Sequence, residues 1–274
     1  MTYKLLALDL DGTTLQDDHK LNPWVKEYVQ RIKEKYTVMI VTGRHHTAAK
    51  PYYDEFGLTT PIICCNGVYR YDYAKEKVET GMPIPFDLAQ QFLALAHQFE
   101  LQLVMYTAEG MAFSNYDPMA YMLPLKEWAL SYPQGKQPKI YQIDSFEKEL
   151  EKTACIWKLV VKGNEANFNA FLQQDLIQTH FEGSISGENK IDLAMKGHSK
   201  GQALLNYLQC LDLDSKQVVA AGDNYNDISM INTVGCGIAM LHAEEEIKQH
   251  AHVICSTDNQ GNGLEQILKT YFPI

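Results

Sequence analysis

The sequence contains no apolar segment long enough to cross a membrane, since no stretch approaches about 18 uncharged apolar residues. Its first residues, MTYKLLALDLDG, reach two aspartates before any long apolar segment develops, which is not the pattern of a secretion signal. We therefore expect a soluble, cytoplasmic protein with no membrane partner.

The sequence also has little positive charge and no cysteine pair of the CxxC type. Its formal net charge is −10, and no long run of Lys and Arg offers a basic field to nucleic acid. The six cysteines are scattered, and most fall within apolar runs, where a thiol packs as a small hydrophobic group. We predict free, structural cysteines and no nucleic-acid partner. An anionic ligand would have to be held by local groups or by a metal.

Two parts of the chain alternate between apolar strands and helices. With 274 residues, 46% of them apolar, the chain can form one large domain or two ordinary ones. Residues 3–80 contain the apolar runs YKLLALDL, YTVMIVTG and PIICCNG, separated by helical patterns, and the end of the chain shows the same alternation. Such strands are typical of a parallel sheet that helices cover on both faces. We predict an α/β fold in which residues 1–80 and 191–274 form a doubly wound, mostly parallel sheet.

The middle of the chain, residues 81–190, has a different pattern. It contains a hairpin-like stretch, LQLVMYTAEGMAF, with Glu109-Gly110 at the turn, and amphipathic helices such as DLAQQFLALAHQF. The stretches GMPIP before it and SGEN after it have the composition of hinges. We predict an inserted α+β domain that acts as a cap, or lid, over the site of the first domain.

Acidic side chains follow two of the predicted strands. In LLALDLDGTT, Asp9 and Asp11 lie at the carboxyl end of the first strand and, being two positions apart, point the same way. The later strand VVAAGD ends in Asp223, and Asn226 and Asp227 follow in the next turn. Open α/β sheets bind ligands at the carboxyl ends of their strands. Because Mg²⁺ prefers hard oxygen ligands, these converging carboxylates favour a magnesium site over a salt bridge.

Groups that suit an anion are predicted at the same edge of the sheet. The second strand ends in Thr42, Gly43 and Arg44, which offer a hydroxyl, a flexible backbone N–H and a cation. Lys200 opens a helix, so its ammonium joins the positive end of the helix dipole. Each signal is weak alone. Together, four segments that each lie at a strand end or a helix start predict one site for a phosphate and a magnesium ion.

Four segments resemble the motifs of the haloacid dehalogenase-like hydrolases and, within that family, of the Cof-type phosphatases with an inserted cap. They are DLDGTT (9–14), VTGR (41–44), KGHSKGQAL (196–204) and GDNYNDISMI (222–231), and the resemblance spans nearly the whole chain. It implies a phosphatase that works through an aspartyl-phosphate. Asp9 would be the nucleophile, and Asp11 would be the acid and then the base.

The resemblance also implies the remaining roles. Phosphate oxygens would be held by Thr42 and by the backbone amides of Gly43 and Leu10. Asn226 would lie close to the phosphate, and Lys200 would neutralise the charge that the nucleophile shares with the phosphoryl group. Mg²⁺ would be the cofactor, and its ligands would be Asp9, the backbone carbonyl of Asp11 and Asp223, with Asp227 in support.

The substrate is expected to be a small phosphorylated metabolite. VTGRHH, ICCNG followed by YDY, and GDNYNDISM are more similar to bacterial Cof-type phosphatases that act on pyridoxal phosphate than to members that act on sugar phosphates. Pyridoxal phosphate is thus favoured, and a sugar-phosphate phosphatase or a phosphomutase of the same family is the alternative. A phospho-accepting signalling module is less favoured, because a base such as Asp11 would shorten the life of a phosphoaspartate.

Weaker signals surround these motifs. Arg44 and Asn66 are possible substrate contacts, although Asn66-Gly67 fits a tight turn at least as well. We predict that His45 and His46 lie on the surface at the start of a helix. The pattern leaves the substrate-recognising residues of the cap and the oligomeric state open.

Overall fold

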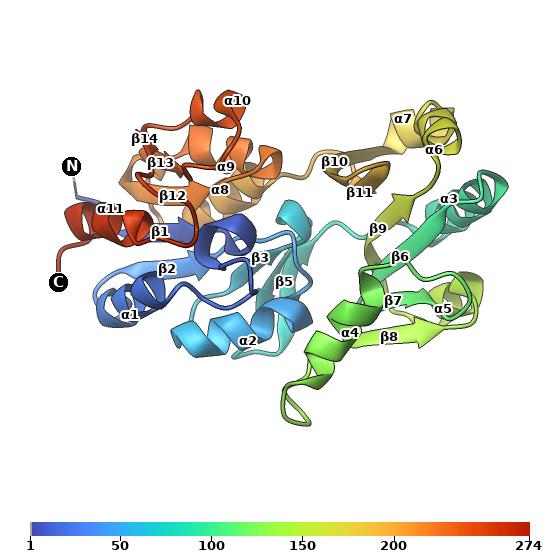
Figure 1. Cartoon of the computed structure of the whole chain (residues 1–274), viewed down its shortest axis with the longest axis horizontal. Coiled ribbons are helices and arrows are strands. Elements are labelled where there is room, and N and C mark those ends of the chain that lie inside the picture. Colours follow the sequence, from blue (N-terminus) through green and yellow to red (C-terminus); the bar gives the residue numbers. More distant parts are fainter. Residues whose placement is uncertain (1) are drawn as a thin grey trace. The chain divides into compact units, whose positions relative to one another are not determined.

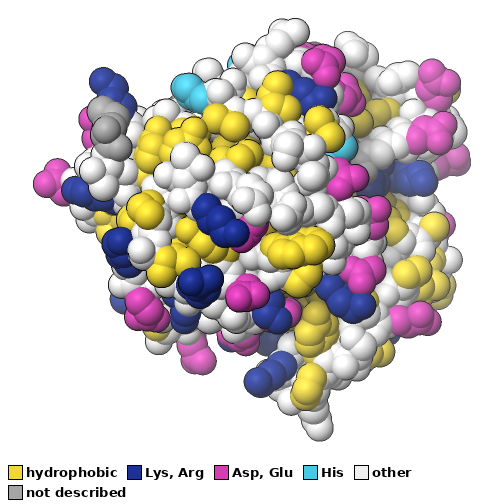
Figure 2. Space-filling model, turned by 60° about the vertical axis from the view of Figure 1, so that its left-hand side comes forward, with side chains coloured by type: hydrophobic (Ala, Val, Ile, Leu, Met, Phe, Trp, Pro, Cys, Tyr) yellow, Lys and Arg dark blue, Asp and Glu magenta, His cyan; other side chains and the backbone are white. Residues whose placement is uncertain are grey.

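The computed structural model describes residues 2–274 and divides them into two compact units. The first unit, called the core here, contains the chain up to Arg44 together with Tyr52–Thr80 and Ser199–Ile274. The second unit, called the cap, contains His45–Pro51 and Gly81–His198. Within the described residues, no helix is long and apolar enough to span a membrane. On the face shown in Figure 2, acidic and basic side chains are interspersed.

The centre of the core is a five-stranded parallel sheet in the order β14-β13-β12-β1-β2. Strand β1, from the start of the chain, pairs in register with β12, more than 200 residues later, so that Leu5 lies opposite Val218. In Figure 1 this pairing brings the blue start of the chain beside its orange and red end. The strands are β1 (Leu5–Leu8), β2 (Thr37–Ile40), β12 (Val218–Gly222), β13 (Cys236–Ala239) and β14 (Val253–Ile254).

Helices cover both faces of this sheet, as its continuous apolar strands predict. Alternate residues such as Leu5 and Ala7 pack with Leu204 of α8 and Met230 of α9 in one apolar cluster. Figure 1 shows α1 and α11 side by side along the sheet, and the Tyr28 hydroxyl of α1 donates to the carbonyl of Phe272 at the end of α11. The core helices are α1 (Pro23–Ile32), α2 (His46–Phe56, whose first turn belongs to the cap), α8 (Lys200–Cys210), α9 (Ile228–Thr233), α10 (Glu245–Lys248) and α11 (Gly263–Tyr271).

The third predicted strand of the first segment does not continue the parallel sheet. Strand β3 (Ile62–Cys64) pairs antiparallel with β4 (Tyr69–Asp72) in a small sheet that β5 (Lys77–Gly81) completes. It meets the main sheet through a single parallel bridge between Ile63 and Val41. The end of β3 is thereby held next to the residues that follow β2.

The cap is built on a six-stranded sheet in the order β10-β11-β9-β6-β7-β8. The predicted hairpin is present: β6 and β7 pair antiparallel, and Thr107 N–H donates to the Gly110 carbonyl across the turn. One face of the sheet buries residues such as Met105 and Leu159 against Phe92 and Phe171 of the helices. The cap elements are α3 (Phe86–Gln98), β6 (Gln102–Thr107), β7 (Met111–Ser114), α4 (Met122–Leu130), β8 (Ile140–Ile143), α5 (Phe146–Lys152), β9 (Ile156–Lys162), α6 (Glu165–Leu172), α7 (Asp175–His180), β10 (Phe181–Gly187) and β11 (Lys190–Met195).

The chain returns to the core later than the expected boundary at residues 190/191. Strand β11 pairs with β9 and β10, so residues up to His198 group with the cap and Ser199 begins the last core segment. SGEN is the tight turn between β10 and β11, with Asn189 at φ +47°, rather than the exit of the cap. The composition of a hairpin turn and that of a hinge are alike, which is why the sequence does not separate them.

Candidate active site

The first site residue, Asp9, follows β1 and is almost fully buried, with 5% of its surface exposed. Residues Leu10–Thr14 then form one irregular turn, in which Gly12 adopts φ +76°. A Cβ at Gly12 would overlap the carboxylate of Asp223. The Thr13 hydroxyl donates to Asp223 Oδ1 at 2.7 Å. This turn therefore brings the residues after β1 against the acidic end of β12, and glycine is required at its close approach.

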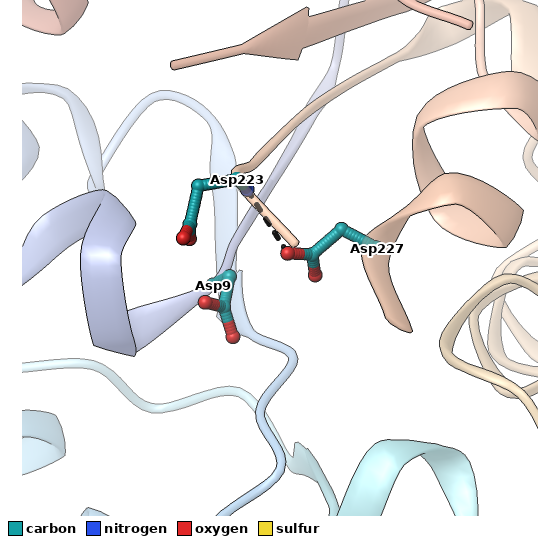
Figure 3. A group of neighbouring side chains, drawn as sticks. All are labelled: Asp9, Asp223 and Asp227. Atoms are coloured by element: carbon teal, nitrogen blue, oxygen red, sulfur yellow. Dashed lines mark hydrogen bonds between the residues drawn. The ribbon is translucent and has the colours of Figure 1, made fainter. Parts of the chain in front are cut away.

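Three carboxylates meet at this edge of the sheet. Each of Asp9, Asp223 and Asp227 has an oxygen within 4.8 Å of the oxygens of the other two. Figure 3 shows the three side chains converging from the end of β1, the end of β12 and the turn before α9. Asp227 is held by its own backbone neighbours, because its Oδ2 accepts hydrogen bonds from the N–H groups of Asp223 (3.0 Å) and Asn224 (3.1 Å).

Lys200 connects two of these carboxylates. Its ammonium, 1% exposed, donates to Asp9 Oδ1 at 2.7 Å and to Asp227 Oδ1 at 2.6 Å. It lies at the first position of α8, whose N-terminus is capped by the Ser199 hydroxyl accepting from Gln202 N–H. Burial disfavours the charged amine, but the Asp227 and Asp9 carboxylates outweigh it and raise the pKa of Lys200. Lys200 is therefore a cation in the site.

The charge of the cluster favours a further cation. Burial raises the pKa of Asp9 well above its usual range, the carboxylates of Asp227 and Asp223 raise it further, and Lys200 opposes them. Three carboxylates around one ammonium leave negative charge uncompensated in a buried place, which is costly. A divalent ion with oxygen ligands would balance that charge, so these side chains fit a hard metal ion.

The residues after β2 lie in the same site. Thr42 is fully buried, and its hydroxyl accepts from the Arg44 N–H at 3.1 Å. The Arg44 guanidinium binds the Asp11 carboxylate through two hydrogen bonds, from Nε at 2.7 Å and from Nη2 at 2.5 Å. The charge and hydrogen bonds of Arg44 lower the pKa of Asp11, because they outweigh the opposing effect of the surrounding protein. Arg44, which the sequence suggested only as a possible substrate contact, is thus a partner of Asp11, the predicted acid and base.

The Asp11 carboxylate opens onto space in the core. Its side chain is 51% exposed, and it borders a cavity of about 420 Å³ that His19 and His242 also line. His242 Nε2 lies 3.6 Å from Asp223 Oδ2, and this interaction raises the pKa of His242. Sequence reasoning did not identify Thr13 or His242. Thr13 lies inside the DLDGTT segment, so the sequence could have suggested it. His242 lies in none of the four motifs, so no sequence signal pointed to it.

Asn226 and Asn66 are brought together from distant parts of the core. Asn226 Nδ2 donates to Asn66 Oδ1 at 3.0 Å across 160 residues of sequence. Asn66 is 7% exposed, and its amide oxygen lies against Gly43. Gly43 and Asn226, which were predicted to bind phosphate, and Asn66, a possible substrate contact, are therefore in one cluster.

The prediction that His45 and His46 lie on the surface is wrong. His45 is fully buried and His46 is 9% exposed, with ring centroids 4.2 Å apart. Within the cap unit, His45 Nε2 lies 3.0 Å from the Thr107 carbonyl. Burial lowers the pKa of both rings, and that of His46 falls to about 3. His45, just before α2, thus contacts the end of β6 within the cap unit, a contact that the local sequence does not reveal.

Comparison with known proteins agrees with this geometry. The family model described as haloacid dehalogenase-like hydrolase matches residues 6–268. The chain belongs to this family. Pyridoxal phosphate phosphatase YbhA of Escherichia coli is 32% identical over 276 residues, covering 99% of both chains. The 5-amino-6-(5-phospho-D-ribitylamino)uracil phosphatase YitU of Bacillus subtilis is 25% identical and covers 98% of both.

A solved structure shows the same fold. A haloacid dehalogenase-like hydrolase from Bacteroides thetaiotaomicron, 22% identical, superposes with a TM-score of 0.84 over 99% of this chain and 100% of its own. The predicted α/β core with an inserted cap is confirmed for this haloacid dehalogenase-like hydrolase, as is its class, a phosphatase. The family uses a divalent metal, which the cluster of Asp9, Asp223 and Asp227 could hold.

Proposed function

We propose that this protein is a Mg²⁺-dependent phosphomonoester hydrolase that works through an aspartyl-phosphate on Asp9. The observation that carries the proposal is the buried Lys200 ammonium between Asp9 and Asp227, with Asp223 in the same cluster. A carboxylate is repelled by a phosphate dianion, so it can attack only where cations cancel charge. Mg²⁺, held by Asp9, the backbone carbonyl of Asp11, Asp223 and Asp227, would supply charge neutralisation and orientation.

The chain's own groups account for both halves of the reaction. An oxygen of Asp9 forms a bond to phosphorus while the bond from phosphorus to the ester oxygen breaks. Because Arg44 lowers the pKa of Asp11, Asp11 would have to take up a proton when the substrate binds, and it then gives that proton to the departing alcohol. Asp11 then takes a proton from water, the water oxygen bonds to phosphorus, and the bond from phosphorus to Asp9 breaks. Inorganic phosphate leaves, and Asp9 and the proton on Asp11 are regenerated.

The phosphate oxygens would be bound by groups that follow three strands of the core. Thr42, the amides of Gly43 and Leu10, and Asn226 provide donors at the ends of β1, β2 and β12. Lys200 would neutralise the charge that passes between Asp9 and the phosphoryl group. Arg44 would hold the Asp11 carboxylate in place through its two hydrogen bonds.

Pyridoxal phosphate is the proposed substrate, and the cap is proposed to close over it as a lid in the cytoplasm. Support for the substrate comes from the relative that is 32% identical over the full length and is named for it. The second relative is named for a phosphorylated ribitylaminouracil, so another small phosphometabolite, including a sugar phosphate, is the alternative. The two classes differ in the shape of the alcohol, which the cap would contact.

A panel of phosphomonoesters tests the proposal. We expect phosphate release from p-nitrophenyl phosphate and a higher kcat/KM with pyridoxal phosphate, both abolished by chelation of divalent ions and by Asp9→Asn. Turnover by Asp9→Asn, or turnover that survives chelation, would overturn the mechanism. Similar kcat/KM values for all the esters would remove the support for pyridoxal phosphate as the substrate.

The same assay separates the alternatives. A phosphomutase would return the phosphoryl group to a sugar without net phosphate release. A signalling module would keep label on Asp9 for many minutes and hydrolyse none of the esters.

A further inference from the structure

The turn after β3 has a positive φ at three consecutive residues. Cys65, Asn66 and Gly67 have φ values of +51°, +61° and +101°. The left-handed region is unfavourable for residues with a Cβ, and such strain persists only where the surroundings enforce it. At Gly67 the reason is steric, because a Cβ there would overlap the carbonyl of Ser199, the residue that caps α8 before Lys200. The strain at Asn66 needs a different explanation.

Backbone hydrogen bonds tie this turn to the residues on both sides of Gly43. Cys65 N–H donates to the Arg44 carbonyl at 3.1 Å, and Asn66 N–H donates to the Thr42 carbonyl at 3.0 Å. A Cβ at Gly43 would lie 2.8 Å from Asn66 Oδ1, so the Asn66 amide takes the space that a side chain at Gly43 would need. The turn therefore supports the Thr42-Gly43 backbone, which is the proposed phosphate-binding segment.

The Asn66 side chain also holds Asn226. Its Oδ1 accepts from Asn226 Nδ2 at 3.0 Å. Within residues 2–274, the Asn226 Oδ1 atom is buried and has no hydrogen-bond partner. Asn66 thus fixes one hydrogen of the Asn226 amide nitrogen, and the second hydrogen can be donated to a phosphate oxygen. The buried Oδ1 is an acceptor and is costly until a donor such as water satisfies it.

We propose that Asn66 is a positioning residue for phosphate binding. Asn66 would act on the phosphate by holding Asn226 and the Thr42-Gly43 backbone in place, without touching the phosphate itself. Its left-handed backbone conformation places its side-chain amide between Asn226 and Gly43. This inference rests on the proposed function. Local structure alone would be better served by glycine at position 66, since glycine accepts positive φ without strain but has no amide to offer.

The deciding variant is therefore Asn66→Gly, because it separates stability from activity. We expect its thermal unfolding midpoint to be unchanged or higher than that of the wild type. We expect KM for p-nitrophenyl phosphate to rise about tenfold. The dissociation constant of inorganic phosphate, measured by calorimetry with Mg²⁺ present, should rise by the same factor, which corresponds to about the net free energy of one hydrogen bond. The expected change in kcat is smaller.

Asn189→Gly is the matched control. Asn189 is also left-handed, at φ +47°, but lies in the β10-β11 turn of the cap. We expect it to leave KM and phosphate binding unchanged. An Asn66→Gly protein with unaltered phosphate affinity would overturn the proposal.

A double-mutant cycle tests the route through Asn226. If Asn66 acts mainly by holding Asn226, then Asn226→Ala should raise the phosphate dissociation constant, and adding Asn66→Gly should raise it by less than Asn66→Gly does alone. Fully additive effects would contradict the proposal. A wild-type protein that hydrolyses no phosphomonoester would count against the proposed function instead, so the two failures are distinguishable.

Discussion

The core and the cap each bury a lysine, and the two lysines differ in their surroundings. Lys200 in the core is 1% exposed and donates to both Asp9 and Asp227, with Asp223 in the same cluster. Lys158 in the cap is 2% exposed, donates to Asp192 at 2.6 Å and lies 4.1 Å from the centroid of the Tyr106 ring.

The difference lies in the charge that surrounds each ammonium. In the cap, Asp192 also accepts from the Ser186 hydroxyl at 2.8 Å, so the carboxylate that meets Lys158 is itself satisfied at both oxygens. In the core, carboxylates outnumber the ammonium that they surround. A satisfied buried pair adds little stability over apolar packing, whereas an excess of buried carboxylates attracts a cation. The same residue type thus forms a satisfied ion pair in the cap and lies in a cluster with excess carboxylates in the core.

The largest effect is expected for Lys200→Met. It removes the donor to Asp9 and Asp227 and leaves buried carboxylates unpaired, so kcat/KM for p-nitrophenyl phosphate should fall by about 10²–10³-fold. The free energy of unfolding should fall by about 3–5 kcal/mol in the absence of metal. Steady-state kinetics and chemical denaturation measure the two. Lys216→Met, an exposed lysine of the core, is the control, and activity that survives Lys200→Met would end the contrast between the two lysines.

The second largest effect is expected for metal binding, which should depend on a carboxylate of the core and not on one of the cap. Mg²⁺ at about 100 times its dissociation constant should stabilise the wild type by about 2.7 kcal/mol, because it binds only the folded cluster. Asp223→Asn removes one carboxylate and should abolish most of this stabilisation. Asp192→Asn in the cap should leave it intact. Thermal unfolding with and without Mg²⁺ measures the stabilisation. If Mg²⁺ stabilised both variants equally, the metal would not be bound by Asp223.

The cap pair can be tested by replacing it as a whole. Lys158→Met alone strands the Asp192 carboxylate, which is 17% exposed, and should cost about 2–4 kcal/mol of the free energy of unfolding. Adding Asp192→Leu should recover most of that loss. Hydrolysis of p-nitrophenyl phosphate should change little in the double variant. If the double variant is as unstable as Lys158→Met, apolar packing cannot replace the pair. Lys158 would then not be a purely structural residue, as the comparison with Lys200 assumes.

The last prediction concerns pH, and its effect over one pH unit is the smallest of the four. The pKa of folded His46 is about 3, below its ordinary value of about 6.5, because burial disfavours the charged ring. Between these values only the unfolded chain binds the proton, so stability present above about pH 6.5 is lost as the pH falls toward 3, by up to about 1.4 kcal/mol per pH unit. His46→Gln should make the decline shallower in denaturation series across pH. The exposed His250→Gln should not, and an identical slope in both variants would show that His46 is not the group responsible.

Local patterns were sufficient for much of the fold and for the convergence of three acidic residues at one edge of the sheet. Apolar runs and helical spacing predicted β1, β2, β12, α2 and the β6-β7 hairpin, because side-chain periodicity is a local property of the chain. The residues that follow those strands were predicted to meet, since carboxyl ends of parallel strands share one edge. Asp9, Asp223 and Asp227 do so.

Other features depended on contacts between distant residues, and the sequence did not reveal them. Lys200 and Asp9 are 191 positions apart, and only the packed sheet sets their 2.7 Å contact. The pairing of Arg44 with Asp11, the burial of His45 against the cap and the strained conformation of Asn66 likewise arise from neighbours that no local pattern encodes. Thus the sequence by itself determined which side chains lie at the ends of the strands. The tertiary structure decided which of them touch and which are removed from water, because pairing and burial depend on the whole packed chain.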